Sequence, residues 1–359
     1  MCRWFAYISA SEPCLLEDVL INPKHSLANQ VHDHYLPRLL PHDATPSEEQ
    51  DAKARNMLFN IDGLGVAWYT SSNSDFERGN TAQKKDEKEG LRPALYKTIQ
   101  PPMNDMNFRS ICANTETRVC FGHIRAASST AITPVNNHPF VFGRHAFMHN
   151  GAVSDFLTIC RAVNVKLSDA VFANIFGSTD SEHIAGLYMT YLTNGGDKTS
   201  FEKEYPAHEM AAAMHKAIAT IIDLQRQIIG DDKRLPNSLN LCATDGVRLV
   251  ACRFRNHKTS QPPTLYYSSK AGTTLNRKFH DHPDGIKIPG VTDTGKEAAA
   301  HGKHVIVASE PSTYKVEDWE LIPKNQFIVV EADGEFKLAD LPYKTEWAAE
   351  DHDTGKKLD

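Results

Sequence analysis

The chain has 359 residues, enough to bury a substantial core, and this length suits two or three domains or one large layered domain. Its 39 lysines and arginines against 45 aspartates and glutamates give a formal net charge of −6. No basic stripe stands out, so the charge pattern argues against a nucleic-acid-binding protein. A small anionic substrate, which needs only one well-placed arginine, remains compatible with it.

The chain shows no sign of a membrane or secreted protein. No apolar run approaches the length of a membrane span, and the first ten residues contain no long apolar segment typical of a signal peptide. The seven cysteines are odd in number and lack paired spacing, which fits reduced thiols better than a disulfide framework. We therefore expect a cytoplasmic protein that does not associate with membranes.

Short apolar and aromatic segments predict strands in the first part of the chain, at residues 2–9, 64–69, 118–125 and 145–153. In the last of these, Asn150-Gly151 is typical of a tight turn. Helical spacing then predicts helices over 180–192, after a capping box at Thr179–Glu182, and over 208–229, before Gly230.

Strand patterns return in the last third, at residues 239–253, 264–268, 304–308 and 326–338. Strands, then helices, then strands predict an α+β fold with antiparallel sheets and helices packed in layers. Polar segments at 70–90 and 270–302 predict loops, and the charged residues from about Glu346 predict a frayed tail.

The most informative residue is Cys2. If Met1 is removed, Cys2 carries a thiol with a pKa near ~8.5 and a free α-amine with a pKa near ~7.7–8.0. The amine can then act as general base and the sulfur as nucleophile, so that one residue holds the catalytic machinery. A cysteine at position two is usually an accident, so other residues must support this interpretation.

Four segments with polar residues follow Cys2 along the chain. They are 60–69 (NIDGLGVAWY), 122–128 (GHIRAAS), 137–140 with 148–151 (NHPF and MHNG), and 177–182 (GSTDSE). Each has an ordinary structural explanation when taken alone: a hairpin turn at Asn150-Gly151, hydrogen-bonded core histidines at His123 and His138, a surface ion pair of Arg125, and a helix cap at Asp180.

Together these segments predict a site for an amino-acid-like amide. A thiolate that attacks an amide needs an oxyanion hole, which the Asn150 side chain and the Gly151 N–H can provide. The amino-acid end of the substrate needs a cation for its carboxylate and an anion for its ammonium group. Arg125 and Asp180 supply these two charges.

The same segments resemble those of the class-II glutamine amidotransferases, members of the N-terminal-nucleophile hydrolase superfamily. The resemblance implies a four-layer α/β/β/α sandwich. It also implies that Cys2 is the nucleophile, that Asn150 and Gly151 form the oxyanion hole, that Arg125 with Ser128 holds the substrate carboxylate, and that Asp180 holds its α-amine.

Further segments, at 23–30 (PKHSLANQ), 62–69 (DGLGVAWY) and 308–311 (ASEP) with Trp319 and Pro323, resemble one small branch of the family. This branch contains the fungal amidotransferase-like subunit that cleaves the γ-glutamyl bond of glutathione and the bacterial γ-glutamyl amidohydrolase of ergothioneine biosynthesis. The resemblance predicts one domain over 2–343, followed by a disordered charged tail at 344–359. Leu64 replaces the usual phenylalanine, and Ser128 replaces a common threonine but keeps the hydroxyl.

The chain contains no phosphate-cradling glycine loop and no nucleotide fingerprint, so the acceptor is water or a group on another polypeptide. We expect hydrolysis of the γ-glutamyl bond of glutathione, in a complex with a metallopeptidase-like partner. The alternatives are a glutaminase subunit that passes ammonia from glutamine to a partner, and a silent regulatory relative. No metal or other cofactor is expected, because the tight clusters His32-Asp33-His34 and His280-Asp281-His282 fall in predicted loops.

Overall fold

The computed structural model describes residues 2–31, 61–72, 90–127, 130–283, 295–313 and 315–350. Two large sheets form its centre, and neighbouring strands in both are antiparallel. The seven-stranded sheet has the order β13 (Glu320–Leu321), β11 (Tyr266–Ser268), β12 (His304–Ala308), β1 (Arg3–Ser9), β6 (Val119–Ile124), β3 (Leu64–Thr70) and β4 (Arg92–Thr98). The six-stranded sheet has the order β15 (Phe336–Asp340), β14 (Gln326–Val330), β10 (Leu249–Arg255), β9 (Ser238–Thr244), β8 (His145–Ala152) and β7 (Phe140–Phe142).

Strand β1 shows why the two sheets stack. Its side chains alternate between the faces of the sheet, as the pleat requires. Trp4, Ala6 and Ile8 enter the core between the two sheets, whereas Phe5 and Tyr7 enter a second core on the opposite face. All seven residues of the strand are buried, so β1 lies inside the molecule with apolar partners on both sides.

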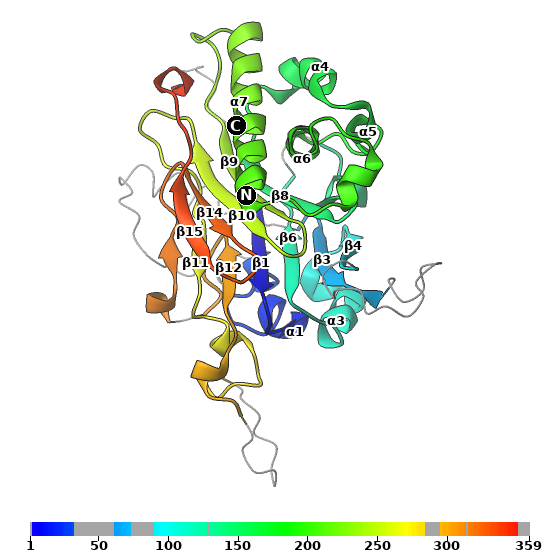
Figure 1. Ribbon diagram of the computed structural model, residues 1–359, viewed down its shortest axis with the longest axis vertical. Helices are drawn as coiled ribbons and strands as arrows, with labels where there is room; N and C mark the ends of the chain where they lie inside the picture. Colours follow the sequence, from blue (N-terminus) through cyan, green and yellow to red (C-terminus); the bar gives the residue numbers. More distant parts are fainter. Residues whose placement is uncertain are drawn as a thin grey trace.

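The helices cover the two outer faces. Helices α4 (Phe156–Lys166), α5 (Asp169–Phe172), α6 (Asp180–Leu192) and α7 (Ala207–Ile228) share one core with the six-stranded sheet. Helices α1 (Leu16–Leu20) and α3 (Met106–Ala113) share the core on the outer face of the seven-stranded sheet. Figure 1 shows α4 to α7 gathered at one end and α1 and α3 at the other. The layers therefore follow the order α/β/β/α, which confirms the predicted fold.

Smaller elements complete the described chain. A two-stranded sheet pairs β2 (Cys14–Leu15) with β5 (Glu116–Thr117). Short 3₁₀ helices occupy Asn29–Val31, Pro102–Asn104, Pro134–Asn136, Lys198–Glu202, Thr273–Leu275, Ala298–Ala300, Val316–Asp318 and Thr345–Trp347. The predicted helices at 180–192 and 208–229 are confirmed as α6 and α7.

The predicted turn at Asn150-Gly151 is wrong. Both residues belong to β8 and pair with Asn240 and Leu239 of β9. The reversal between β7 and β8 falls earlier, at Gly143, which has a positive φ of 55°. Asn-Gly looks the same to sequence reasoning whether it reverses the chain or continues a strand.

The prediction of a disordered tail from residue 344 is wrong as far as Glu350. A 3₁₀ helix spans Thr345–Trp347, and Trp347 is fully buried in the core beneath α7. The guanidinium of Arg234 donates to the carbonyls of Glu346, Trp347 and Ala348. One large apolar side chain and a distant arginine thus order the first residues of the predicted tail.

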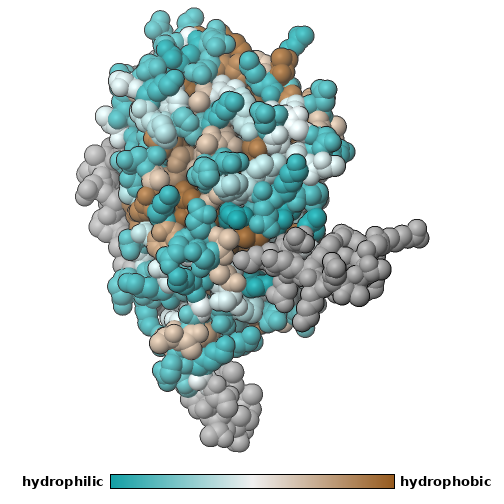
Figure 2. Space-filling view, in the orientation of Figure 1, coloured by the Kyte–Doolittle hydropathy of each residue, from teal (hydrophilic) through white to brown (hydrophobic). Residues whose placement is uncertain are grey.

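The surface is mixed in character. Figure 2 shows a largely hydrophilic face on which apolar residues gather in patches near the middle. In the described part of the chain, no helix is both long and apolar enough to cross a membrane.

Candidate active site

Four of the predicted site residues line one cavity of about 420 Å³: Cys2, Arg125, Gly151 and Asp180. They come from four different places in the fold. Cys2 precedes β1, Arg125 follows β6, Gly151 lies near the end of β8, and Asp180 begins α6. Because β1 and β6 are antiparallel neighbours, the start of one and the end of the other meet at the same edge of the sheet. The register Arg3 to Ile124 places Cys2 beside Arg125.

The sulfur atom of Cys2 lies close to both polar backbone groups of Ala126, the N–H and the carbonyl. The Ala126 N–H donates to Cys2 Sγ at 3.3 Å, and Sγ lies 3.6 Å from the Ala126 carbonyl. Burial raises the pKa of the Cys2 thiol above its ordinary value, while the Ala126 N–H and the Arg125 charge lower it. The effect of burial is the larger one, so the environment favours the neutral thiol.

The guanidinium of Arg125 is fixed on one side of the cavity. It donates to Thr130 Oγ1 at 2.6 Å, to the Ala131 carbonyl at 3.0 Å and to Asn137 Oδ1 at 3.4 Å. Burial lowers its pKa, yet a guanidinium keeps its charge in proteins. All three acceptors are neutral oxygens, so none of these bonds neutralises the guanidinium, although the charges of Asp62 and Asp180 act to raise its pKa.

The carboxylate of Asp180 is oriented by two backbone groups. Oδ2 accepts from Val153 N–H at 2.8 Å, and Oδ1 accepts from Ser181 N–H at 2.8 Å. Thr179 caps the helix by accepting from Glu182 N–H at 3.1 Å. The N-terminal end of α6 stabilises the negative charge. Ser181 Oγ also lies 3.2 Å from Oδ1, whereas Oδ2 has one lone pair that no described group uses.

Asn150 and Gly151 differ in their relation to the cavity. Gly151 lines it, whereas Asn150 is buried beside it with both amide atoms lacking a hydrogen-bond partner. An unpaired buried amide costs free energy, roughly 1–3 kcal/mol, and such groups are rare. Here the unpaired donor lies next to Gly151 and is free to bond an added oxygen.

His149, the neighbour of Asn150, connects β8 to α6. Its Nε2 lies 3.3 Å from the Ser238 carbonyl, which can only accept, so Nε2 carries the hydrogen. Its Nδ1 then accepts from Ser181 Oγ at 2.9 Å. Burial lowers the pKa of His149, in keeping with this neutral form. The bond holds the strand that bears Asn150 against the helix that bears Asp180.

His138 also lines the cavity, and sequence reasoning treated it as a hydrogen-bonded core histidine. It is 4% exposed, and neither ring nitrogen has a hydrogen-bond partner. Its ring lies against that of His123, with 4.0 Å between centroids. The hydrogen-bond explanation is therefore wrong for His138, and no signal in the sequence distinguishes a paired from an unpaired histidine.

Ser128 lies outside the described residues, so its predicted role stays a prediction. His32-Asp33-His34 is outside them as well. Within the described ranges, no group of three or more His, Cys, Asp or Glu side chains could hold a metal ion. All seven cysteines are free.

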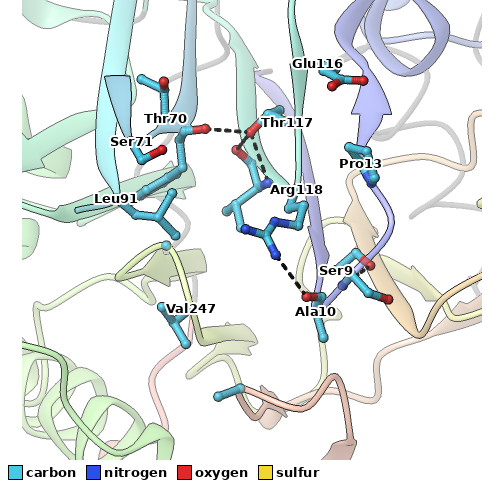
Figure 3. Close-up of a pocket in the computed structure, with 15 residues that line it drawn as sticks. Ser9, Ala10, Pro13, Thr70, Ser71, Leu91, Glu116, Thr117, Arg118 and Val247 are labelled. Atoms are coloured by element: carbon cyan, nitrogen blue, oxygen red, sulfur yellow. Dashed lines mark hydrogen bonds between the residues drawn. The ribbon is translucent and has the colours of Figure 1, made fainter. Parts of the chain in front are cut away.

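A second cavity, of about 370 Å³, lies at the opposite ends of β1 and β3. Figure 3 shows Arg118 pointing across it toward the Ala10 carbonyl, to which its guanidinium donates at 3.4 Å. Its wall combines serines and threonines with apolar residues and the charged residues Glu116 and Arg118. None of its described lining residues is a cysteine or a histidine, in contrast to the cavity at Cys2.

Comparison with known proteins identifies the family. Residues 51–354 match the model of the family described as glutamine amidotransferases class-II. The chain therefore belongs to the class-II glutamine amidotransferases. It is also 28% identical over 332 residues to the Saccharomyces cerevisiae protein named "Probable glutamine amidotransferase DUG3", covering 92% of this chain and 82% of that one. The predicted family and relative are confirmed, although the matched range begins after Cys2.

Solved structures share the fold. A glutamine aminotransferase class-II domain protein from Silicibacter pomeroyi matches with a TM-score of 0.54 and 21% identity, over 95% of this chain and all of that one. The glutamine phosphoribosylpyrophosphate amidotransferase from B. subtilis matches with a TM-score of 0.51 and 10% identity, over 96% of this chain and 50% of its own. At these identities the likeness supports the sandwich fold alone.

Proposed function

We propose that the protein hydrolyses a γ-glutamyl amide, with Cys2 as the nucleophile. The observation that carries this proposal is the single cavity that holds a thiol, a fixed guanidinium and a fixed carboxylate. A γ-glutamyl group ends in an α-carboxylate and an α-ammonium group, which suit Arg125 and Asp180 respectively. Its amide carbon is then presented to Cys2.

The reaction needs removal of Met1, which frees the α-amine of Cys2. The amine takes the thiol proton, and Sγ attacks the amide carbon. The carbonyl oxygen becomes an oxyanion, stabilised by the Asn150 side-chain N–H and the Gly151 backbone N–H. The C–N bond breaks, and the leaving amine receives the proton held by the α-amine. Water then cleaves the thioester with the same amine as base and releases glutamate.

Glutathione is the substrate we propose first, as implied by the resemblance to the branch that cleaves it. The strands after residue 238 contribute to both sheets, so this part of the chain completes the sandwich and supplies no separate acceptor domain. We therefore propose water as the acceptor, and a metallopeptidase-like partner for the remaining dipeptide. The seven free cysteines favour the cytoplasm.

The second candidate is a glutaminase subunit that passes ammonia to a partner. The name of the yeast relative favours it. The γ-glutamyl pocket would be the same in both cases, because only the leaving group differs.

One experiment separates the two candidates. The protein is purified from its own source with whatever binds it, and glutamate and ammonia release are measured with glutathione, glutamine and a γ-glutamyl dipeptide. Glutamate release from glutathione is the expected result. Transfer of ammonia from glutamine to an acceptor, with glutathione untouched, would establish the second candidate, and no turnover of any substrate would favour a silent relative.

A further inference from the structure

The turn that follows β8, residues 153–155, is hydrogen-bonded to a set of buried side-chain amides. Ser154 N–H donates to Asn237 Oδ1 at 2.9 Å, and the Ser154 carbonyl accepts from Gln225 Nε2 at 2.6 Å. Asn237 and Gln225 also bond each other in both directions, at 2.9 and 2.7 Å. Neither amide side chain is exposed at all. Both polar backbone groups of Ser154 are thus fixed by side chains from α7 and from the residue that precedes β9.

This turn also orients Asp180, the side chain proposed to hold the substrate ammonium group. Val153, the residue before Ser154, gives its N–H to Asp180. Asp155, the residue after it, has a left-handed backbone with φ 54° and accepts from Leu235 N–H at 3.2 Å. A left-handed aspartate persists only where its surroundings hold it. Val153 and Asp155 both line the cavity.

The same amides continue to the C-terminal segment. Asn237 N–H donates to Asn256 Oδ1 at 2.6 Å, and Asn256 Nδ2 donates to the Trp347 carbonyl at 2.9 Å. The Asn256 carbonyl accepts from Ala349 N–H at 2.8 Å. A continuous path of hydrogen bonds therefore runs from Trp347 through Asn256 and Asn237 to the turn that bonds Asp180.

We propose that Asn256, Asn237 and Gln225 are positioning residues, and that the C-terminal segment 345–349 anchors them so that Asp180 faces the substrate. The proposal rests on the proposed function for the role of Asp180. The C-terminal segment contributes to substrate recognition without lining the cavity, because it fixes the turn that fixes the carboxylate. Buried amide networks of this kind rigidify what they bond only when every member is satisfied.

The first test measures backbone motion and needs no activity. Asn256→Ala removes the middle of the path, and hydrogen exchange is followed by mass spectrometry in peptides that cover residues 150–156. We expect exchange of the Val153 and Ser154 amides to accelerate by about tenfold, as for the loss of one hydrogen bond. Unchanged exchange there, with faster exchange around Trp347, would overturn the proposal.

The matched control is Asn276→Ala. Asn276 is also buried, but its side-chain amide donates to the Pro13 carbonyl at 3.3 Å. Within the described residues, it makes no hydrogen bond to Asn256, Asn237, Gln225 or the turn at Ser154. It should leave exchange at 150–156 unchanged. If Asn256→Ala does not fold, Asn256→Asp makes the same test, because it keeps the acceptor for Asn237 N–H and loses only the donor to Trp347.

The second test uses kinetics. Asn256→Ala should raise KM for a γ-glutamyl substrate about tenfold with a smaller change in kcat, and should add little further when Asp180 is already Asn, since the two act through one contact. Independent, multiplying effects would overturn the positioning role. If wild-type protein cleaves no γ-glutamyl substrate, the proposed function fails, while the exchange result still decides whether the path holds the turn.

Discussion

Gly151 of β8 lies against the carbonyl of Ser238 on β9, so closely that a β-carbon on Gly151 would be 1.9 Å from that oxygen. Its φ of +144° is also one that L side chains rarely adopt. The strand therefore brings bare backbone to the cavity wall, and the Gly151 N–H can reach a substrate oxygen with no side chain in the way.

Gly151→Ala should abolish activity and lower the free energy of unfolding by more than the roughly 1–2 kcal/mol that a left-handed backbone costs an L residue. The matched control is Gly230→Ala, where φ is +91° but nothing lies within 4 Å of an added β-carbon. Gly230→Ala should lower the free energy of unfolding by only the roughly 1–2 kcal/mol that the left-handed backbone costs, and it should keep activity. Urea unfolding and glutamate release check both variants, and equal effects would show that the Ser238 contact does not matter.

Asn150→Ala should lower kcat by ~10²–10³ with little change in KM, because one oxyanion donor is lost. Asn240 faces Asn150 across the β8–β9 pair, so Asn240→Ala serves as control. It should reduce stability, because its amide bonds the Pro263 carbonyl at 3.1 Å, while kcat stays within a few-fold. Similar losses of kcat in both variants would assign the effect to the sheet and leave Asn150 without an oxyanion role.

Active protein should begin at Cys2. Intact-mass measurement should show Met1 missing, since an acylated amine cannot take the thiol proton. Cys2→Ala should remove turnover, whereas Cys160→Ala, at a half-buried cysteine of α4, should not. Full activity in a species that retains Met1 would contradict the mechanism.

Arg125→Lys should raise KM by roughly 10–100-fold, because lysine keeps the charge but cannot make the three bonds of the guanidinium. Arg144 is equally buried and donates from Nε to the Asp245 carbonyl at 2.9 Å, away from the cavity. Arg144→Lys should therefore lower the melting temperature and leave KM unchanged. Steady-state kinetics and thermal unfolding distinguish the two variants, and an unchanged KM for Arg125→Lys would argue against a bound carboxylate.

Stability should fall in mild acid because of buried neutral histidines. Burial lowers the pKa of His145 to about 3, and that of His123 to about 3. The unfolded chain takes up these protons near pH 6.5, so between about pH 6.5 and 3 it binds more protons than the folded chain. Each such histidine then removes ~1.4 kcal/mol of stability per pH unit as the pH falls. Unfolding free energies measured at pH 7, 6 and 5 should show this slope. His145→Gln should reduce the slope by ~1.4 kcal/mol per pH unit, because the unfolded chain then takes up one proton fewer.

The sequence predicted several strands and helices well because the pattern of apolar residues is local. The apolar and aromatic run at residues 2–9 predicted the strand, whereas the order of the four layers came from the family resemblance; the structure then places Phe5 and Tyr7 on one face of β1 and Trp4 and Ala6 on the other. The start of α6 was also predicted correctly, because Thr179 caps the helix through a hydrogen bond to a residue only three positions later in the sequence. Both signals lie within one short stretch of chain.

The sequence failed where the deciding contact is distant. Trp347 stands in a charged segment, and its partners Arg234 and Asn256 lie about a hundred residues earlier. The Asn150-Gly151 pair suggested a turn, because the sequence does not show that both residues pair with β9. The unpaired amide of Asn150 likewise depends on which distant residues surround it. His138 looked like an ordinary core histidine for the same reason.

The first turn of α6 joins three neighbours through three consecutive residues. Asp180 bonds Val153, Ser181 bonds His149, and Glu182 accepts two N–H groups from the backbone just before the helix. Since a helix turns about 100° per residue, a single insertion or deletion here would misdirect all three at once. Across related proteins these positions should therefore change together or not at all, and directed evolution toward new substrates should vary them as one block.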